Sequence, residues 1–201
     1  MKKFVIATNN KKKLIELNRI LEPLSIDAVT AKEIGIDLGD VEENGSTFAE
    51  NAYIKAKSAF DLLNGEYPVV ADDSGLCVDA LCGAPGIYSA RFGGEGLTDS
   101  DRVDKLLFDM KDVPDKDRQA HFTCSICAVM PDGYVITAEG ECNGFIGLQP
   151  IGDGGFGYDP VFMVGDKSFS QLSAEEKDKY SHRGNALRLF KEKLVKYMEE
   201  K

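Results

Sequence analysis

The stretch "YPVVADDSGLCVDALCGAPGIYSARF", residues 67 to 92, decides which fold the sequence predicts. It opens with a short valine-rich run that is typical of a buried strand and continues directly into Asp72 and Asp73. Two neighbouring carboxylates at this point are explained by a polar turn, or by a site that holds a cation or activates water. These residues alone leave both explanations open. We predict a strand ending near Asp72 and a loop beyond it.

The sequence before this stretch predicts two more strands and two helices. Residues 3–8 are a β-branched apolar run typical of a buried strand, and residues 25–30 form a weaker one. Leucines at helical spacing in residues 14–21 indicate a helix. A second helix is expected over residues 46–65, with Thr47 and Glu50 as its capping box.

The sequence after this stretch continues the mixture of helices and strands. We expect a helix over residues 98–110, and a hairpin in which Pro131-Asp132-Gly133 joins residues 118–130 to 134–142. A short helix capped by Ser173 and a final helix over 184–199 follow. The predicted class is therefore α/β, with a mixed, twisted sheet and flanking helices.

Composition limits the classes of function. The 201 residues suit a single domain, or two lobes that share one sheet. The net charge of −10 argues against a nucleic-acid-binding protein. No run approaches about 18 consecutive apolar residues, and the first residues lack a signal peptide's apolar stretch, so we expect a cytoplasmic protein without a membrane partner. Cys124 and Cys127 are expected on opposite faces of a strand, which prevents them from sharing a metal.

The segment "ATNNKKK" joins the first strand to the first helix. Exposed amides at a helix start, side chains of Thr8, Asn9 and Asn10, and the lysines at 11–13 could together bind a phosphate. The alternative is a capped helix with solvated lysines. The spacing is not that of a Walker A loop.

Three other segments carry candidate site residues. Asp72 and Asp73, with Glu42 or Glu43 from an acidic loop, have the oxygen ligands that Mg²⁺ prefers, and one carboxylate could accept a proton from water. In "GGFGYDP", an aromatic ring among glycines could stack on a base. "SHRGNAL" offers hydrogen-bond donors at a helix start. Each segment also has a purely structural explanation. The two aspartates could form a polar turn, the aromatics of "GGFGYDP" could belong to the core, and "SHRGNAL" could be a solvated helix end.

The motifs "TNNKKK", "ENAYIKA", "ADDSGLCVDALCGAPGIYSARF", "GGFGYDPVF" and "SHRGNAL" occur in the order and spacing of a known family. From about residue 4 to 195 the chain resembles the inosine/xanthosine triphosphate pyrophosphatases. This resemblance implies a Mg²⁺-dependent enzyme that hydrolyses ITP, dITP and XTP to the monophosphate and pyrophosphate. It also implies a homodimer and an elongated, two-lobed, inosine triphosphatase-like fold, with residues 1–201 as one domain and a cleft between the lobes.

The resemblance also implies roles for individual residues. Asp73 is the expected proton acceptor, and Glu42, Asp72 and Asp73 are the expected metal ligands, with Glu43 an open alternative to Glu42. The substrate-binding residues implied are Thr8, Asn9, Asn10, Lys11, Lys12, Lys13, Lys55, Ser74, Phe156, Gly157, Tyr158, Asp159, Lys177, His182 and Arg183. Many relatives carry glycine at the position of Asn9, and asparagine tolerates the same left-handed backbone.

Two other functions remain as alternatives. One is a related pyrophosphatase that acts on modified pyrimidine nucleotides, which turnover of methylated pyrimidine triphosphates would reveal. The other is a non-catalytic nucleotide-binding protein, which would bind without releasing pyrophosphate. The complete carboxylate set and the phosphate-facing segment favour an enzyme.

Overall fold

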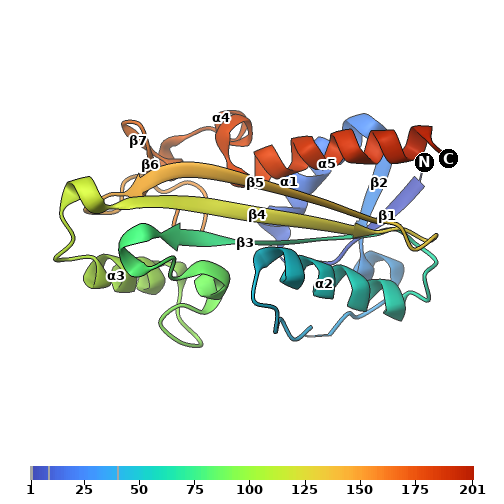
Figure 1. Ribbon diagram of the computed structural model, residues 1–201, viewed down its shortest axis with the longest axis horizontal. Coiled ribbons are helices and arrows are strands. Elements are labelled where there is room, and N and C mark those ends of the chain that lie inside the picture. The colour runs from blue at the N-terminus through green and yellow to red at the C-terminus, as the bar shows by residue number, and fades with distance from the viewer. Residues whose placement is uncertain (1, 9, 40) are drawn as a thin grey trace. The chain divides into compact units, whose positions relative to one another are not determined.

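A computed structural model describes residues 2–8, 10–39 and 41–201 (Figure 1). Seven strands form a mixed sheet in the order β2-β1-β3-β4-β5-β6-β7. Strands β1, β2 and β3 are parallel neighbours, whereas β6 runs antiparallel to β5 and β7. The strands are β1 (Lys2–Ile6), β2 (Ile26–Thr30), β3 (Val69–Val78), β4 (Gln119–Val129), β5 (Val135–Ile146), β6 (Phe162–Val164) and β7 (Lys167–Ser168).

The α-helices follow the local signals in the sequence. They are α1 (Lys11–Leu21), α2 (Phe48–Leu62), α3 (Asp99–Asp109), α4 (Ala174–Tyr180) and α5 (His182–Glu199). The hydroxyl of Ser173 caps α4 and Glu176 completes its capping box. At α2 the hydroxyl of Thr47 caps the helix, but the Glu50 carboxylate bonds Ser46 instead of closing a box with Thr47.

The chain divides into two compact units. Unit 1 consists of residues 1–73, 124–140 and 185–201, and unit 2 of residues 74–123 and 141–184. Each unit has its own apolar core within the described residues. Among these residues, unit 1 contains two clusters of buried apolar side chains and unit 2 contains one. That residues 1–201 form one domain of two lobes stays a prediction.

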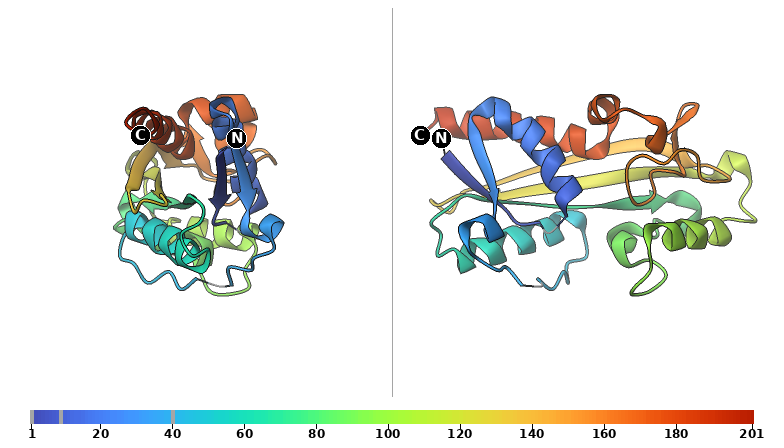
Figure 2. Two further views of the ribbon diagram at one scale, coloured as in Figure 1. Left: turned by 90° about the vertical axis from the view of Figure 1, so that its right-hand side faces the viewer. Right: turned by 180° about the vertical axis from the view of Figure 1, so that it is seen from behind.

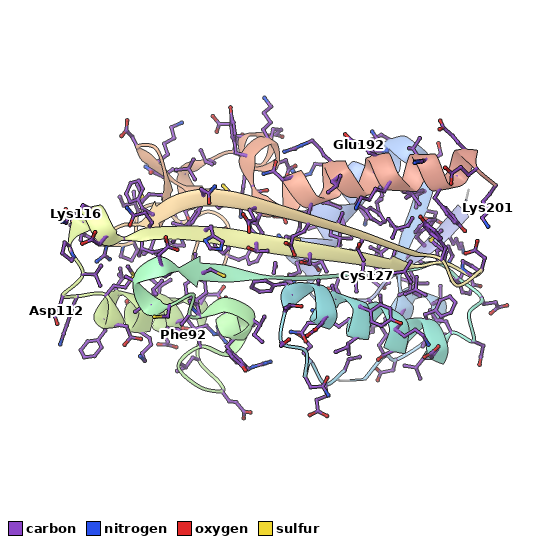
Figure 3. All side chains as sticks on the ribbon, viewed as in Figure 1. Phe92, Asp112, Lys116, Cys127, Glu192 and Lys201 are labelled. Atoms are coloured by element: carbon purple, nitrogen blue, oxygen red, sulfur yellow. The ribbon has the colours of Figure 1, made fainter. Side chains whose placement is uncertain are left out.

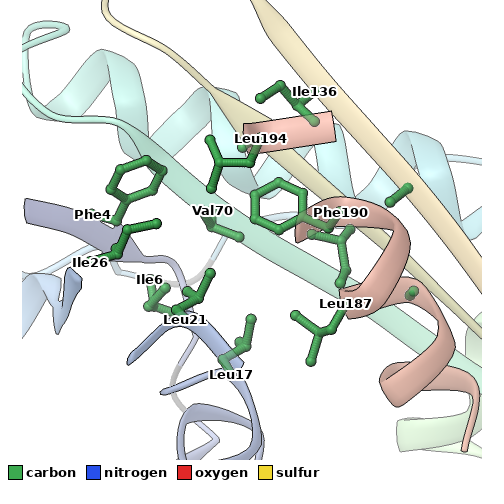
Figure 4. Close-up of a cluster of buried hydrophobic side chains, with 14 of the residues drawn as sticks. Phe4, Ile6, Leu17, Leu21, Ile26, Val70, Ile136, Leu187, Phe190 and Leu194 are labelled. Atoms are coloured by element: carbon green, nitrogen blue, oxygen red, sulfur yellow. The ribbon is translucent and has the colours of Figure 1, made fainter. Parts of the chain in front are cut away.

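Unit 1 is layered, with helices on both faces of its strands. Figures 1 and 2 show α1 and α5 on one face and α2 on the other. On the first face, side chains such as Ile6, Val70 and Phe190 pack together (Figure 4). On the second face, small residues of α2 lie against the opposite sides of β1 and β3. Because strand side chains alternate between faces, one strand supplies both layers.

Unit 2 is built around aromatic rings. The Phe122 ring lies 4.7 Å from the Phe162 ring and 5.9 Å from the Phe169 ring, measured between centroids. Leu106 of α3 is buried in the same cluster. This core supports the glycine-rich loop, because Tyr158 belongs to both.

Arg118 is a buried structural residue of unit 2, with an exposed fraction of 3%. Its guanidinium donates to the carbonyl oxygens of Ile146 at 2.7 Å, Met110 at 2.8 Å and Gly147 at 3.0 Å. We expect Arg118→Met to lower the free energy of unfolding by about 3 kcal/mol, because buried carbonyls lose their donors. Urea unfolding measures this change. Arg91→Met, at an exposed arginine, is the control, and equal stability of the two variants would contradict the prediction.

The structure confirms the α/β class, the mixed sheet and the hairpin, whose turn is closed by Met130 N donating to Tyr134 O at 2.9 Å. Cys124 belongs to the core cluster on the α1 and α5 face, and Cys127, labelled in Figure 3, belongs to the cluster on the α2 face. The two cysteines therefore lie on opposite faces of β4, as predicted. The predicted end of β3 was wrong, because the strand does not end at Asp72 but continues to Val78. Strand β5 also runs further than predicted, to Ile146. Within the described ranges, no helix has the length and apolar character needed to cross a membrane.

Candidate active site

Asp72 and Asp73 lie inside strand β3, not in a turn after it. Val70 belongs to the core cluster on the α1 and α5 face, and Val69 and Ala71 belong to the cluster on the α2 face. By strand alternation Asp72 faces the first cluster and Asp73 the second. The two carboxylates therefore point to opposite sides of the strand, and each meets a lysine from the helix that covers its side.

On the α1 face, the side chain of Asp72 is fully buried and lies 2.9 Å from Lys13 Nζ. The Cys124 thiol is 4.0 Å from the same carboxylate oxygen. Asn10 caps α1 by accepting a hydrogen bond from Lys13 N at 3.3 Å, and Asn10 N donates to Thr8 Oγ1 at 3.2 Å. These contacts place Thr8, Asn10 and Lys13 together in unit 1.

On the α2 face, Asp73 is held by two side chains of one helix. Lys55 Nζ lies 2.8 Å from Asp73 Oδ1 and 3.4 Å from Glu43 Oε1. Asn51 Nδ2 lies 3.4 Å from Asp73 Oδ2. Asn51 and Lys55 are four residues apart, so they occupy the same face of α2.

The pKa values of this pair follow from burial and charge. Burial raises the pKa of Asp73, an effect that the nearby Lys55 ammonium only partly offsets. Burial alone would lower the pKa of Lys55, but Asp73, Asp72 and Glu43 together raise it. Lys55 therefore stays charged at neutral pH, while the Asp73 carboxylate has a higher proton affinity than an exposed aspartate.

The α2 face also has the donor chemistry that a hard divalent cation requires. Asp73 and Glu43 converge on one cationic position, which the Lys55 ammonium takes here, and both offer carboxylate oxygens. Of the two glutamates, Glu43 is the one that shares a lysine with Asp73. In residues 2–8, 10–39 and 41–201, no three acidic, histidine or cysteine side chains form a preformed metal centre. The predicted roles of Glu42 and Asp72 as ligands stay predictions.

In unit 2 the glycine-rich loop closes on a buried ion pair. Asp159 Oδ2 accepts hydrogen bonds from Lys177 Nζ at 2.6 Å and from the backbone N–H of Phe156 at 2.9 Å. A Cβ at Gly155 would overlap the Asp159 carboxylate, so only glycine allows this approach. The Lys177 ammonium also lies 5.0 Å from the centre of the Phe156 ring.

The segment around residue 182 is buried in unit 2. Helix α5 begins at His182, two residues earlier than predicted, so His182 and Arg183 form its first turn. The His182 ring stacks on Phe122 at 4.6 Å. The Arg183 guanidinium donates to Ser74 Oγ at 2.9 Å. The alternative of a solvated helix end is wrong for these two residues, because both are buried.

Three contacts near the candidate site were not predicted from the sequence. Asn51 is one helical turn before Lys55 in "ENAYIKA", and that spacing was a usable signal. The Asp99 carboxylate accepts from Gly157 N at 2.8 Å, and Tyr158 donates to Ser89 O at 2.9 Å. Nothing in the sequence indicates these last two contacts, since their partners are remote.

Asn9 lies outside the described residues, and so do the side chains of Lys11 and Lys12. The described part of the segment nevertheless holds Thr8, Asn10 and Lys13, whose contacts are given above.

The mixed sheet with helices on both faces of its strands defines an α/β protein. Its buried carboxylates and the lysines that face them have the chemistry to bind a cation and a phosphorylated ligand. The chain belongs to the Ham1 family, whose family model matches residues 4–193. It is 46% identical over 200 residues to the dITP/XTP pyrophosphatase of Clostridium perfringens, covering 96% of this chain and 98% of that protein. It is 45% identical over 190 residues to the enzyme of that name from Halalkalibacterium halodurans, covering 94% and 96% of the two chains.

Solved structures agree with this assignment. The Staphylococcus aureus Ham1 protein superposes with a TM-score of 0.87 at 42% identity, covering 98% of this chain and all of that one. A HAM1 protein from Coxiella burnetii gives 0.86 at 38% identity over the full length of both chains. The family that the sequence resembles is thereby confirmed.

Proposed function

We propose that this protein hydrolyses the deaminated purine nucleotides ITP, dITP and XTP to the monophosphate and pyrophosphate. The observation that carries the proposal is the buried Asp73 carboxylate, which has a raised pKa and lies 2.8 Å from Lys55 Nζ. A carboxylate with increased proton affinity, close to fixed ammonium groups, has the chemistry of a general base beside a phosphate site. The relatives named dITP/XTP pyrophosphatase support the same substrate class.

In this proposal the residues of unit 1 serve the reacting phosphates. Asp73 accepts a proton from the water that attacks the α-phosphorus, and the P–O bond to the leaving pyrophosphate breaks. The negative charge of the leaving pyrophosphate is stabilised by the ammonium groups of Lys13 and Lys55 and by the backbone amides at the start of α1. Thr8 and Asn10 fix the segment in which Lys13 lies, through the contacts at 3.2 and 3.3 Å.

Mg²⁺ is the cation that the oxygen donors suit, and we assign Asp73 and Glu43 as the residues that would hold it. When bound, the ion gathers phosphate charge and lowers the pKa of water. Lys55 would then exchange its carboxylate contacts for contacts with phosphate oxygens, because it and the cation compete for the same two carboxylates.

In unit 2 the proposal assigns the base to the side chains around Phe156. The ring of Phe156 is the stacking surface, and the cations of Lys177 and Arg183 lie 5.0 and 5.9 Å from its centre. Cationic donors match the 6-keto oxygen of hypoxanthine and xanthine and do not match the 6-amino group of adenine. The Asp159 carboxylate orients Lys177 and closes the loop.

Pyrophosphate release tests the proposal. With Mg²⁺, we expect kcat/KM for dITP and XTP to exceed that for dATP and dGTP by at least about 100-fold, and chelation to abolish turnover. Preference for methylated pyrimidine triphosphates would favour the related pyrophosphatase. Tight binding of dITP without pyrophosphate release would identify a non-catalytic binding protein.

Lys13→Ala tests the triphosphate contact. We expect KM for dITP to rise about 10- to 100-fold, because a charge-assisted bond to phosphate is lost. The melting temperature should fall as well, because the buried Asp72 loses the charge pair with Lys13. Adding Asp72→Asn should restore stability and leave KM high. Lys193→Ala is the control, since Lys193 is exposed and donates to the carbonyl oxygen of Thr137 in unit 1. Matching KM values for the two lysine variants would remove Lys13 from the site.

We also infer a cytoplasmic homodimer. The family resemblance motivates this assembly, and light scattering of the purified protein tests it. A monomer mass at micromolar concentration would contradict it.

A further inference from the structure

The amide of Asn51 links the proposed base to the acidic segment that precedes α2. We propose that Asn51 is a positioning residue that orients Asp73 for proton transfer, and this inference rests on the proposed function. Asn51 is fully buried in α2. It lies neither in the phosphate segment nor in the set of expected ligands.

The orientation of the Asn51 amide is fixed by its partners. Its Oδ1 accepts a hydrogen bond from the backbone N–H of Gly45 at 2.9 Å. A backbone N–H can only donate, so the oxygen of the amide must face Gly45. The Nδ2 group is thereby directed to Asp73 Oδ2, 3.4 Å away.

Gly45 shows how closely the backbone approaches this amide. A Cβ at this glycine would lie 2.7 Å from Asn51 Oδ1 and 2.8 Å from the Cβ of Glu50. A side chain at this position would force the segment away from α2. The close approach therefore requires glycine at position 45 and a side-chain oxygen at position 51.

Lys55 makes the parallel connection one helical turn later. Its ammonium joins Asp73 Oδ1 to Glu43, whereas Asn51 joins Asp73 Oδ2 to Gly45. Each oxygen of the carboxylate thus has its own donor from α2. With one donor at each oxygen, rotation of the carboxylate about its last bond is opposed from both sides.

A neutral amide is the residue type that this position requires. Aspartate at position 51 would keep an oxygen for the Gly45 N–H but would present a second carboxylate to Asp73. Alanine would remove the acceptor for the Gly45 N–H and the donor to Asp73 Oδ2. Asparagine supplies a donor to Asp73 without placing a second negative charge beside a buried carboxylate.

The test compares Asn51→Asp and Asn51→Ala with Glu50→Ala. Glu50 bonds the same segment, since its carboxylate accepts from Ser46 N at 2.7 Å, but it has no bond to Asp73. We expect both Asn51 variants to lose kcat for dITP by about 10- to 100-fold with KM changed less than about threefold, because misplacement of a reacting group affects the chemical step. Glu50→Ala should lower the melting temperature and keep kcat within about twofold of the unchanged protein.

Crystal structures of the unchanged protein and Asn51→Ala give a readout besides activity, and the Asp73 carboxylate should be rotated in the variant. Full kcat in both Asn51 variants, or an unmoved Asp73, would overturn the inference. Equal loss of kcat in Glu50→Ala would also overturn it and assign the effect to anchoring of the segment. An unchanged protein that releases no pyrophosphate from any triphosphate would refute the proposed function instead, and the structures would still test the contact.

Discussion

Asp73→Asn is expected to abolish turnover of dITP, with kcat lowered about 1,000-fold or more, because the variant has no carboxylate to accept the proton of water. The asparagine keeps one oxygen that can accept from Lys55, so the local contacts survive. Single-turnover release of pyrophosphate measures the effect. Near-normal kcat would remove Asp73 as the base.

The raised pKa of Asp73 also predicts how this variant changes stability. The folded protein binds a proton on Asp73 more tightly than the unfolded chain does, so the contribution of this group is greatest below the usual value of 3.8. That contribution is lost as pH rises through the higher pKa of the folded state. At neutral pH without metal, the gain from removing this buried charge is opposed by the loss of the charge pair with Lys55, so Asp73→Asn should lower the melting temperature less than Lys55→Ala does. A large fall in melting temperature would mean that loss of activity reflects misfolding.

Lys55→Ala is expected to have the second largest effect. The change leaves Asp73 and Glu43 without the ammonium that lies 2.8 and 3.4 Å from them. Breaking a buried pair by removing one partner costs about 3 kcal/mol or more. We expect kcat/KM for dITP to fall about 100-fold, because Asp73 becomes harder to ionise and a phosphate contact is lost.

Lys57→Ala is the matched control for this experiment. Lys57 lies on the same helix and forms an exposed pair with Asp61 at 2.5 Å. Exposed pairs at this spacing contribute about 0.5 kcal/mol or less. If Lys55→Ala keeps kcat/KM within about threefold of Lys57→Ala, Lys55 does not serve the phosphates.

Local signals predicted the helices well because the interactions that start them are local. Thr98 and Asp101 form the capping box of α3, and Ser173 with Glu176 forms that of α4, each over three residues. The start of α5, which was predicted two residues too late, has a different explanation. Gly184 looked like a helix start, but Ser181 Oγ accepts its N–H at 3.1 Å from inside the turn before it.

The strand boundary at Asp72 failed for a non-local reason. Asp-Asp-Ser-Gly has the composition of a turn, and only partners from elsewhere in the chain make it acceptable as a buried strand. Those partners are Lys13 and Lys55, which lie 59 and 18 residues away from Asp72 and Asp73 (72 − 13 and 73 − 55). The alternation that separated Cys124 from Cys127 applies equally to the two aspartates once the strand is extended.

The sequence by itself determined the class of the fold, the family and the approximate positions of the helices, and it predicted the residue types of the candidate site, because these depend on periodicity, caps and motif spacing. Only the tertiary structure decided which carboxylate meets which lysine. Strand β3 directs Asp72 to α1 and Asp73 to α2, and the amide of Asn51 joins Asp73 to Gly45. These pairings depend on how the helices pack on the two faces of the strand, and such long-range contacts leave no periodic or local trace in a single sequence.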